Sequence, residues 1–206
     1  MNLRTDIAGV ILAGGKSSRM GSSKALLQFR GTTLIQHIAS VLTRAFASVS
    51  IIADRGEKFS FLNLPAYSDI KKNCGPLGGI HSAFHHTKAE SIFVVSCDEP
   101  FVSKDLIDYI CDFESVSDIK VPSFHGNVQP LCGLYRKSVL PAIERCFAAD
   151  DLRMKHLLLQ CHTTTIPVSP ALPFYKEHLF ANLNNPSDYQ AALELRSGKD
   201  FDSDGT

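Results

Sequence analysis

The sequence predicts an α/β fold, a doubly wound, mostly parallel sheet with helices on both faces. Three runs, residues 7–13, 49–53 and 91–96, are apolar almost throughout, as expected for parallel strands buried on both faces. A stretch with helical periodicity separates the first two runs, which makes a strand–helix–strand unit and requires a parallel sheet. The segments richest in Gly, Asp and cations border strand ends or helix starts, where such sheets bind ligands.

The expected helices begin at capping residues or at proline. Ser, Thr and Asp side chains accept hydrogen bonds from the first turn of a helix, and proline fits that turn. The expected starts are Thr32 or Thr33 before apolar positions 34–45, Pro76 before 77–87, Ser103 before 104–113, Asp150 or Asp151 before 151–160, and Pro186 in a helix over 186–195.

The remaining elements are a hairpin, one more helix and one more strand. A strand over 118–124 turns at Gly126-Asn127, and residues 128–135 are expected to pair back on it in antiparallel fashion. A helix is expected at about 138–148 and a strand near 162–168, whereas residues 54–75 look polar and irregular.

Length and composition indicate one domain. The chain has 206 residues, of which 44% are hydrophobic and 20% charged, enough for one sizeable core. We assign residues 1–196 to this domain and 197–206 (SGKDFDSDGT) to a flexible C-terminal tail.

Charge and cysteine usage exclude several functions. Lys+Arg and Asp+Glu balance at 21 each, which argues against a nucleic-acid-coating or membrane-surface protein. No apolar run approaches ~18 residues, so no membrane span is expected. The six Cys form no C-x-x-C pair, so we expect reduced thiols, a cytoplasmic location and no structural metal site.

A basic, glycine-rich loop follows the first strand. Residues 9–27 read GVILAGGKSSRMGSSKALL. The loop does not match the Walker pattern G-x-x-x-x-G-K-[ST], because position 10, where the first glycine should stand, is Val. It does not match the dinucleotide-binding pattern G-x-G-x-x-G either. The loop nevertheless carries the cations Lys16, Arg19 and Lys24 and no acidic residue. Such a loop suits a polyphosphate; the alternative is a solvated basic turn.

Two aspartates and a glycine cluster border other strand ends. Asp98 follows the strand at 91–96, and a carboxylate fixed there is a natural Mg²⁺ ligand. The alternative, that it caps the helix starting near 103, places it too far along the chain. Asp69 is a second acidic candidate, with turn formation as its alternative. Gly75, Gly78 and Gly79 flank Pro76, where they either admit a ligand closely or pack a helix on the sheet.

A phosphate loop together with a metal-binding carboxylate indicates phosphoryl or nucleotidyl transfer. In that chemistry the protein mainly positions groups and neutralises charge. Serine hydrolysis is disfavoured, because the serines near the loop form no G-x-S-x-G elbow.

Five stretches in order resemble the molybdenum cofactor guanylyltransferases of the MobA family, over about residues 5–195. They are LAGGKSSRMGSSK at 12–24, the Asp69 segment with GPLGG at 75–79, CDEP at 97–100, QPLCGLY at 129–135 and ANLNNP at 181–186. The Gly14-Gly15 pair resembles the guanylyl branch of the superfamily. The resemblance implies a Rossmann-like fold similar to the nucleotide-diphospho-sugar transferases, and GMP transfer from GTP to molybdopterin or the molybdenum cofactor.

The resemblance also implies a role for each matching residue. Arg19, Lys24 and Asp98 would be catalytic, and Asp98 would hold Mg²⁺, with Mn²⁺ as the alternative. Asn182 and Asn184 would bind the pterin; their alternative role is turn formation before Pro186. The implied nucleotide contacts are Leu12, Ala13, Gly14, Gly15, Lys24, Asp69 and Asp98, and the implied substrate contacts are Gly78, Gly79, Asn182 and Asn184.

One departure from the family pattern concerns the base. Members often carry Asn near the end of the second strand, whereas this sequence has Ile52 there, with Asp54 as a substitute. CTP as donor, another phosphorylated acceptor and a non-catalytic GTP- or cofactor-binding adaptor therefore stay as alternatives. Cofactor-insertion proteins and molybdoenzymes are the implied protein partners; no nucleic acid or membrane is expected.

Overall fold

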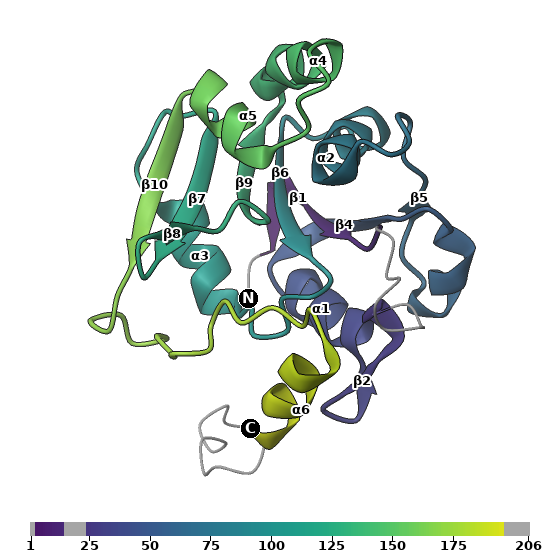
Figure 1. The fold of residues 1–206 in the computed structure, drawn as a ribbon, viewed down its shortest axis with the longest axis vertical. Coiled ribbons are helices and arrows are strands. Elements are labelled where there is room, and N and C mark those ends of the chain that lie inside the picture. The colour runs from purple at the N-terminus through teal and green to yellow at the C-terminus, as the bar shows by residue number, and fades with distance from the viewer. Residues whose placement is uncertain (1–2, 15–23, 196–206) are drawn as a thin grey trace.

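The computed structural model describes residues 3–14 and 24–195 of the chain. The main sheet has the strand order β10-β7-β9-β6-β1-β4-β5, with β8 paired to β7 (Figure 1). Its strands are β1 (Arg4–Leu12), β4 (Phe46–Ile52), β5 (Ala66–Tyr67), β6 (Ser91–Ser96), β7 (Ile119–Phe124), β8 (Asn127–Val128), β9 (Cys132–Arg136) and β10 (Thr163–Val168).

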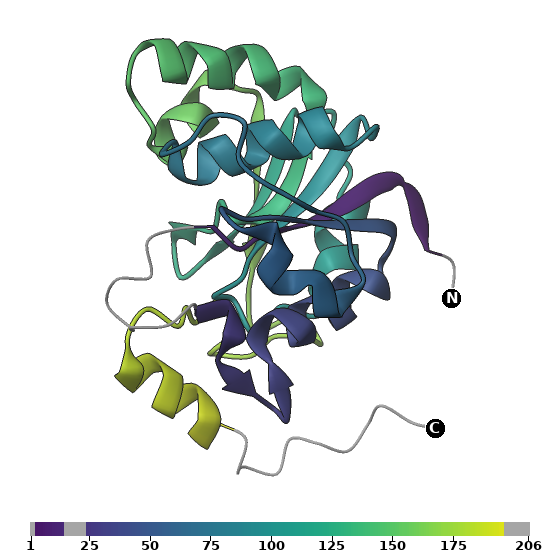
Figure 2. The same cartoon turned by 90° about the vertical axis from the view of Figure 1, so that its right-hand side faces the viewer.

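Helices cover both faces of this sheet, which confirms the predicted fold class. The α-helices are α1 (Leu34–Thr43), α2 (Gly75–His86), α3 (Lys104–Asp112), α4 (Leu140–Ala148), α5 (Met154–Gln160) and α6 (Pro186–Glu194). Helices α2, α4 and α5 lie on one face and α1 and α3 on the other (Figure 2). In β1, Ile7 and Ile11 point into the core beside α1, whereas Ala8 and Val10 point into the core beside α2. Residues 7–12 of this strand are apolar because both of its faces are buried there, whereas Arg4, Thr5 and Asp6 at its start are not buried.

Helix starts largely follow the capping residues that the sequence provides. Thr33 caps α1 in a capping box with Gln36, and Ser103 caps α3 by accepting a hydrogen bond from the Leu106 N–H. Pro76 lies in the first turn of α2. These three predictions are confirmed.

The predicted start of α5 at Asp150 or Asp151 is wrong. This helix begins at Met154, and Arg153 precedes it without a side-chain cap. The Asp151 carboxylate instead accepts hydrogen bonds from the Arg153 guanidinium at 2.9 and 2.7 Å. Asp150 has a φ of 52°, in the left-handed region, so it belongs to the turn after α4.

Strand β9 lies inside the sheet, antiparallel to both of its neighbours. It pairs with β7, where Ile119 faces Tyr135, and with β6 over residues 91–95. A Cβ at Gly133 would lie 2.6 Å from the carbonyl oxygen of Lys120, so the close approach of β9 to β7 requires glycine. The predicted antiparallel pairing is confirmed, and β6 is a second partner that the sequence does not indicate.

Smaller elements complete the described structure. Strands β2 (Gln28–Phe29) and β3 (Thr32–Thr33) form a hairpin, and 3-10 turns occur at η1 (Lys24–Leu26), η2 (Gly56–Leu62) and η3 (Lys137–Val139). Residues 54–75, expected to be irregular, therefore contain η2 and β5. No helix in the described part of the chain is long and apolar enough to cross a membrane. The predicted tail over 197–206 lies outside the described residues, and the domain boundary stays a prediction.

Candidate active site

The carboxyl ends of β1 and β6 lie side by side and carry two of the predicted site segments. Leu12 pairs with Ser96 in the β1–β6 register. Just beyond it, the Cys97 N–H donates to the Leu12 carbonyl at 3.0 Å, and the Ala13 N–H donates to the Ile52 carbonyl at 2.8 Å. These bonds hold the start of the glycine-rich loop beside the segment that begins at Cys97. Gly15, an implied nucleotide contact, and Arg19, an implied catalytic residue, lie outside the described residues.

Lys24, Asp98 and Asn184 meet at this edge. Lys24 Nζ lies 3.6 Å from Asp98 Oδ2 and donates a hydrogen bond to Asn184 Oδ1 at 3.2 Å. The Leu183 N–H donates to the Asp98 carbonyl at 3.0 Å. These contacts join three segments that are far apart in the sequence, and the segment between β10 and α6 passes across the end of the sheet to reach them (Figure 1).

The Asp98 side chain is held in place but stays accessible. Ser96 Oγ donates to Asp98 Oδ1 at 2.5 Å, which fixes one carboxylate oxygen. The side chain remains 23% exposed, and that of Lys24 remains 18% exposed. Ser103, and not Asp98, caps α3, so the capping alternative for Asp98 is excluded. The carboxylate is therefore available to a ligand at this edge.

Asp69 lies next to the start of the glycine-rich loop. A Cβ at Gly14 would lie 3.9 Å from Asp69 Oδ2. Oδ1 is buried without a hydrogen-bond partner among the described residues. Burial, followed by the charge of Asp54, raises the pKa of Asp69 above its ordinary value, and the charge of Lys72 opposes this shift. A buried acceptor without a partner favours a ligand that donates a hydrogen bond here.

Gly78 and Gly79 have a packing role. A Cβ at Gly79 would lie 2.8 Å from Leu12 Cδ2, and one at Gly78 would lie 2.9 Å from the Lys71 carbonyl oxygen. Small residues at these positions let α2 lie against the end of β1 and against the loop that carries Asp69. The predicted contact of the two glycines with substrate stays a prediction.

The asparagines before α6 divide their roles. Asn185 caps α6 by accepting a hydrogen bond from the Asp188 N–H at 2.9 Å. Asn184 instead bonds to Lys24, and Asn182 Oδ1 is buried without a hydrogen-bond partner in the described structure. The turn before Pro186 is thus maintained by Asn185. That Asn182 and Asn184 bind the pterin stays a prediction.

Glu99 is a buried acid that the sequence analysis did not assign to the site. It is 5% exposed, and burial together with the charge of Asp98 raises its pKa to about 8. Its carboxyl group is therefore mostly protonated at pH 7. The sequence feature that could have indicated this role is the acidic pair Asp98-Glu99, which follows a strand and precedes Pro100.

Family members often carry Asn where this chain has Ile52, and the described structure offers no other group at that position to contact the base. Ile52 is 2% exposed, and its carbonyl accepts the hydrogen bond from Ala13. Asp54, two residues on, is exposed, and its charge contributes to the raised pKa of Asp69. Asp54 is therefore positioned near the predicted nucleotide contacts.

Ser82 holds the segment that follows Asp69. It is fully buried on α2, where its Oγ accepts a hydrogen bond from the Ile70 N–H at 2.9 Å and donates to the Gly78 carbonyl at 2.7 Å. We expect Ser82→Ala to lower stability by about 1 kcal/mol, because the part-buried hydrogen bond from the Ile70 N–H and the buried one to the Gly78 carbonyl are both lost. We also expect a several-fold higher KM for the nucleotide with little change in kcat, measured by steady-state kinetics and thermal unfolding.

Ser40→Ala is the matched control for Ser82. Ser40 is exposed on α1, and its hydroxyl donates only to the carbonyl of His37. This variant should leave stability and KM unchanged. A Ser82→Ala enzyme with an unchanged KM would contradict the positioning role and leave Ser82 with packing alone.

Comparison with known proteins places this site in a family. Residues 9–164 match the MobA-like NTP transferase domain. The probable molybdenum cofactor guanylyltransferase of Carboxydothermus hydrogenoformans is 33% identical over 192 residues, which cover 92% of this chain and 96% of that protein. The molybdenum cofactor guanylyltransferase of Photobacterium profundum is 35% identical over 184 residues, covering 88% and 92%.

A solved structure has the same fold. The molybdopterin-guanine dinucleotide biosynthesis protein A of Archaeoglobus fulgidus superposes with a TM-score of 0.80 at 24% identity, over 92% of this chain and 98% of that one. The match over residues 9–164 includes Lys24, Asp69 and Asp98. On these grounds the chain belongs to the MobA-like NTP transferase family.

Proposed function

We propose that the protein transfers GMP from GTP to the terminal phosphate of molybdopterin or the molybdenum cofactor, forming the guanine dinucleotide and releasing pyrophosphate. The observation that carries the proposal is the meeting of Lys24, Asp98 and Asn184 at the carboxyl edge of the sheet. The names of relatives that are 33–35% identical over most of their length support the substrates.

The proposed step needs alignment and charge neutralisation more than a strong base. A terminal phosphate oxygen of the acceptor attacks the α-phosphorus of GTP, and the bond from this phosphorus to the bridging oxygen breaks. The electron pair leaves with pyrophosphate. Lys24 would neutralise the charge that develops on the leaving group. Asn184 would set the position of Lys24 and contact the acceptor.

Asp98 fits a hard divalent cation, Mg²⁺ or alternatively Mn²⁺. Its carboxylate is partly exposed at the catalytic edge and offers the oxygen ligands that Mg²⁺ prefers. Over residues 3–14 and 24–195, no group of three or more His, Cys, Asp or Glu gathers to hold a metal ion. We therefore expect the ion to bind together with the phosphates of the nucleotide. When bound, it would neutralise charge on those phosphates.

We place this reaction in the cytoplasm, with cofactor-insertion proteins and molybdoenzymes as the partners that receive the product. The supporting observation is that all six cysteines are free thiols and four of them are buried. Burial raises the pKa of Cys97 and Cys111 to about 12, so these two stay protonated and unreactive.

Pyrophosphate release with molybdopterin and Mg²⁺ tests the function, with GTP, CTP and ATP compared at equal concentration. We expect release with GTP only, and none when the metal is removed by a chelator. Release mainly with CTP would overturn guanine as the base, and Ile52 would be the first residue to examine. The fold and the type of reaction would remain as proposed. GTP binding without release from any nucleotide would favour the adaptor and overturn the catalytic proposal.

A further inference from the structure

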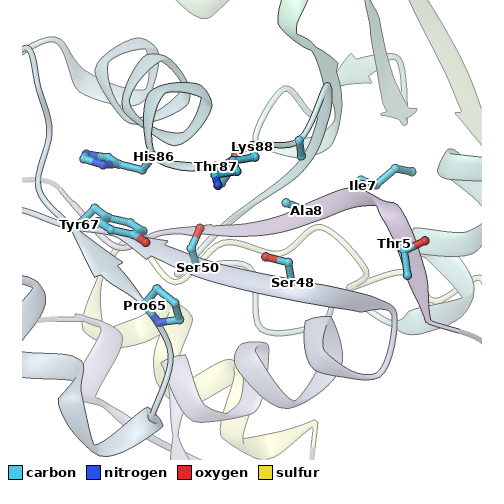
Figure 3. A pocket seen from close by; sticks show the side chains of 11 residues that line it. Thr5, Ile7, Ala8, Ser48, Ser50, Pro65, Tyr67, His86, Thr87 and Lys88 are labelled. Carbon is cyan, nitrogen blue, oxygen red and sulfur yellow. The ribbon is translucent and has the colours of Figure 1, made fainter.

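A hollow lies on the face of the sheet that α2 covers, away from the catalytic edge. It measures about 380 Å³. Its walls come from the first half of β1, from β4 and β5, and from the end of α2 with the residues that follow (Figure 3). We call it the Ser50 hollow and define it by the polar residues Ser48, Ser50, Tyr67, Thr87 and Lys88.

The Ser50 hollow is separate from the nucleotide site. It reaches β1 at Thr5, Ile7 and Ala8, whereas the catalytic edge begins at Leu12. Four residues of strand at roughly 3.3 Å each place Ala8 about 13 Å from Leu12 along β1. On β5, Tyr67 is in register with Leu12 through Ile52 but lies two strands away from it. Helix α2 separates the hollow from the catalytic edge in the same way, because its first residues pack beside Asp69 and its last residue, His86, lines the hollow.

Two buried hydroxyl groups in this wall have no partner. Ser50 is 4% exposed, and its Oγ makes no hydrogen bond in the described structure. Thr87 Oγ1 is likewise buried and unpaired within the described residues. Buried polar oxygens in native proteins are nearly always hydrogen-bonded. Two of them in the wall of one hollow point to a ligand that accepts or donates hydrogen bonds there.

The wall around these hydroxyls is shaped by an aromatic pair. The rings of Tyr67 and His86 stack in parallel, with centroids 4.3 Å apart. The hydroxyl end of Tyr67 lies on the side of Ser50 (Figure 3). This stack fixes the position of Tyr67, so its hydroxyl joins those of Ser48 and Ser50 along one side of the hollow.

The charge of the wall selects the sign of the ligand. Lys88 makes no ion pair with any described residue, and the residues that line the hollow include no carboxylate. Hydroxyl donors and an ammonium group without a competing acid suit an oxyanion. The carboxyl end of α2 also lies here, and its partial negative charge opposes the binding of any anion, which limits the ligand to a low charge.

We propose that the Ser50 hollow is a second binding site, for a small oxyanion with one or two negative charges. The ligand class is a phosphate monoester or an organic carboxylate, held by Ser50, Thr87 and Lys88. The site is independent of GTP. It stands whether or not the proposed transfer reaction is correct.

Residue-resolved NMR titration of the whole protein tests this site, with inorganic phosphate and acetate as the two probes. We expect the amide signals of Ser48, Ser50 and Thr87 to shift in a saturable manner. The Lys24→Ala background removes phosphate binding at the catalytic edge and should leave these shifts in place. Saturation by phosphate alone assigns the phosphate ester, and saturation by acetate alone assigns the carboxylate.

Variants of exposed lysines make the test specific. Lys88→Ala should raise the Kd of the probe at least tenfold, and because Lys88 is exposed we expect the fold to be retained. Lys155→Ala, an exposed lysine on α5, should change the Kd less than twofold. The proposal is overturned by shifts confined to the catalytic edge, by no saturation with either probe, or by equal Kd values for the two variants.

Discussion

Asp98→Asn is expected to reduce pyrophosphate release by about 10²–10³-fold, the range seen when one preorganised electrostatic group is removed from an active site. The substitution keeps the shape of the side chain and an oxygen that can accept the hydrogen bond from Ser96. It removes the negative charge opposite Lys24 and the oxygen ligand that we assign to the metal. The measurement is kcat at saturating GTP and Mg²⁺, together with the thermal unfolding midpoint, which should stay near that of the wild type. Asp98→Ala should lose turnover at least as completely.

Asp105→Asn is the matched control for Asp98. Asp105 is an exposed acid in the first turn of α3, a short distance along the chain, and touches none of the predicted site residues in the described structure. It should retain turnover. Wild-type turnover in Asp98→Asn would remove the metal assignment, and a collapse of the unfolding midpoint would show that Asp98 acts mainly on the fold.

Lys24→Ala is expected to lower the transfer rate by about 10²-fold while moving the unfolding midpoint very little. Among the described residues, the Lys24 ammonium group is the cation nearest to Asp98. We propose that it neutralises the negative charge on pyrophosphate as pyrophosphate leaves. The ion pair of Lys24 with Asp98 is long, at 3.6 Å, and partly exposed. Pairs of this kind contribute about 0–1 kcal/mol to stability. The loss should therefore appear in kcat and much less in unfolding.

Lys104→Ala gives the comparison for Lys24. Lys104 also pairs with an aspartate, Asp108, at 2.5 Å, and is similarly part-exposed, but it lies on α3 outside the proposed site. It should keep full activity. If Lys24→Ala destabilised the protein strongly and kept its rate of transfer, Lys24 would be a structural residue that only anchors Asn184.

Local signals in the sequence predicted the elements whose causes are local. The run Ser91–Ser96 is apolar because both faces of β6 are buried, and its bounds were predicted to the residue. Thr33, Ser103 and Pro76 act within one turn of the helices they begin, so their roles were also visible. Asp151 failed as a cap because a neighbouring guanidinium, Arg153, binds its carboxylate.

Long-range packing produced the features that the sequence did not predict. The position of β9 between β6 and β7 depends on pairing with strands on both sides. The contact of Lys24 with Asn184 closes a separation of 160 residues. The burial of Glu99 and the two hydrogen bonds of Ser82 likewise follow from how α2 and the strands pack. Spacing along the chain carries no signal for the position of β9, the contact of Lys24 with Asn184 or the bonds of Ser82.

Strand β1 is synthesised before both of its partners in the sheet. Strand β1 lies between β4 and β6, so one of its edges stays open until residues 91–96 have been synthesised. At roughly 5–20 residues per second this takes several seconds. During that time the nascent chain carries an uncovered apolar strand, a natural target for chaperones at the exit tunnel. Strand β9 then pairs with the other edge of β6. We therefore expect chaperones to stay bound to chains that are truncated before residue 132.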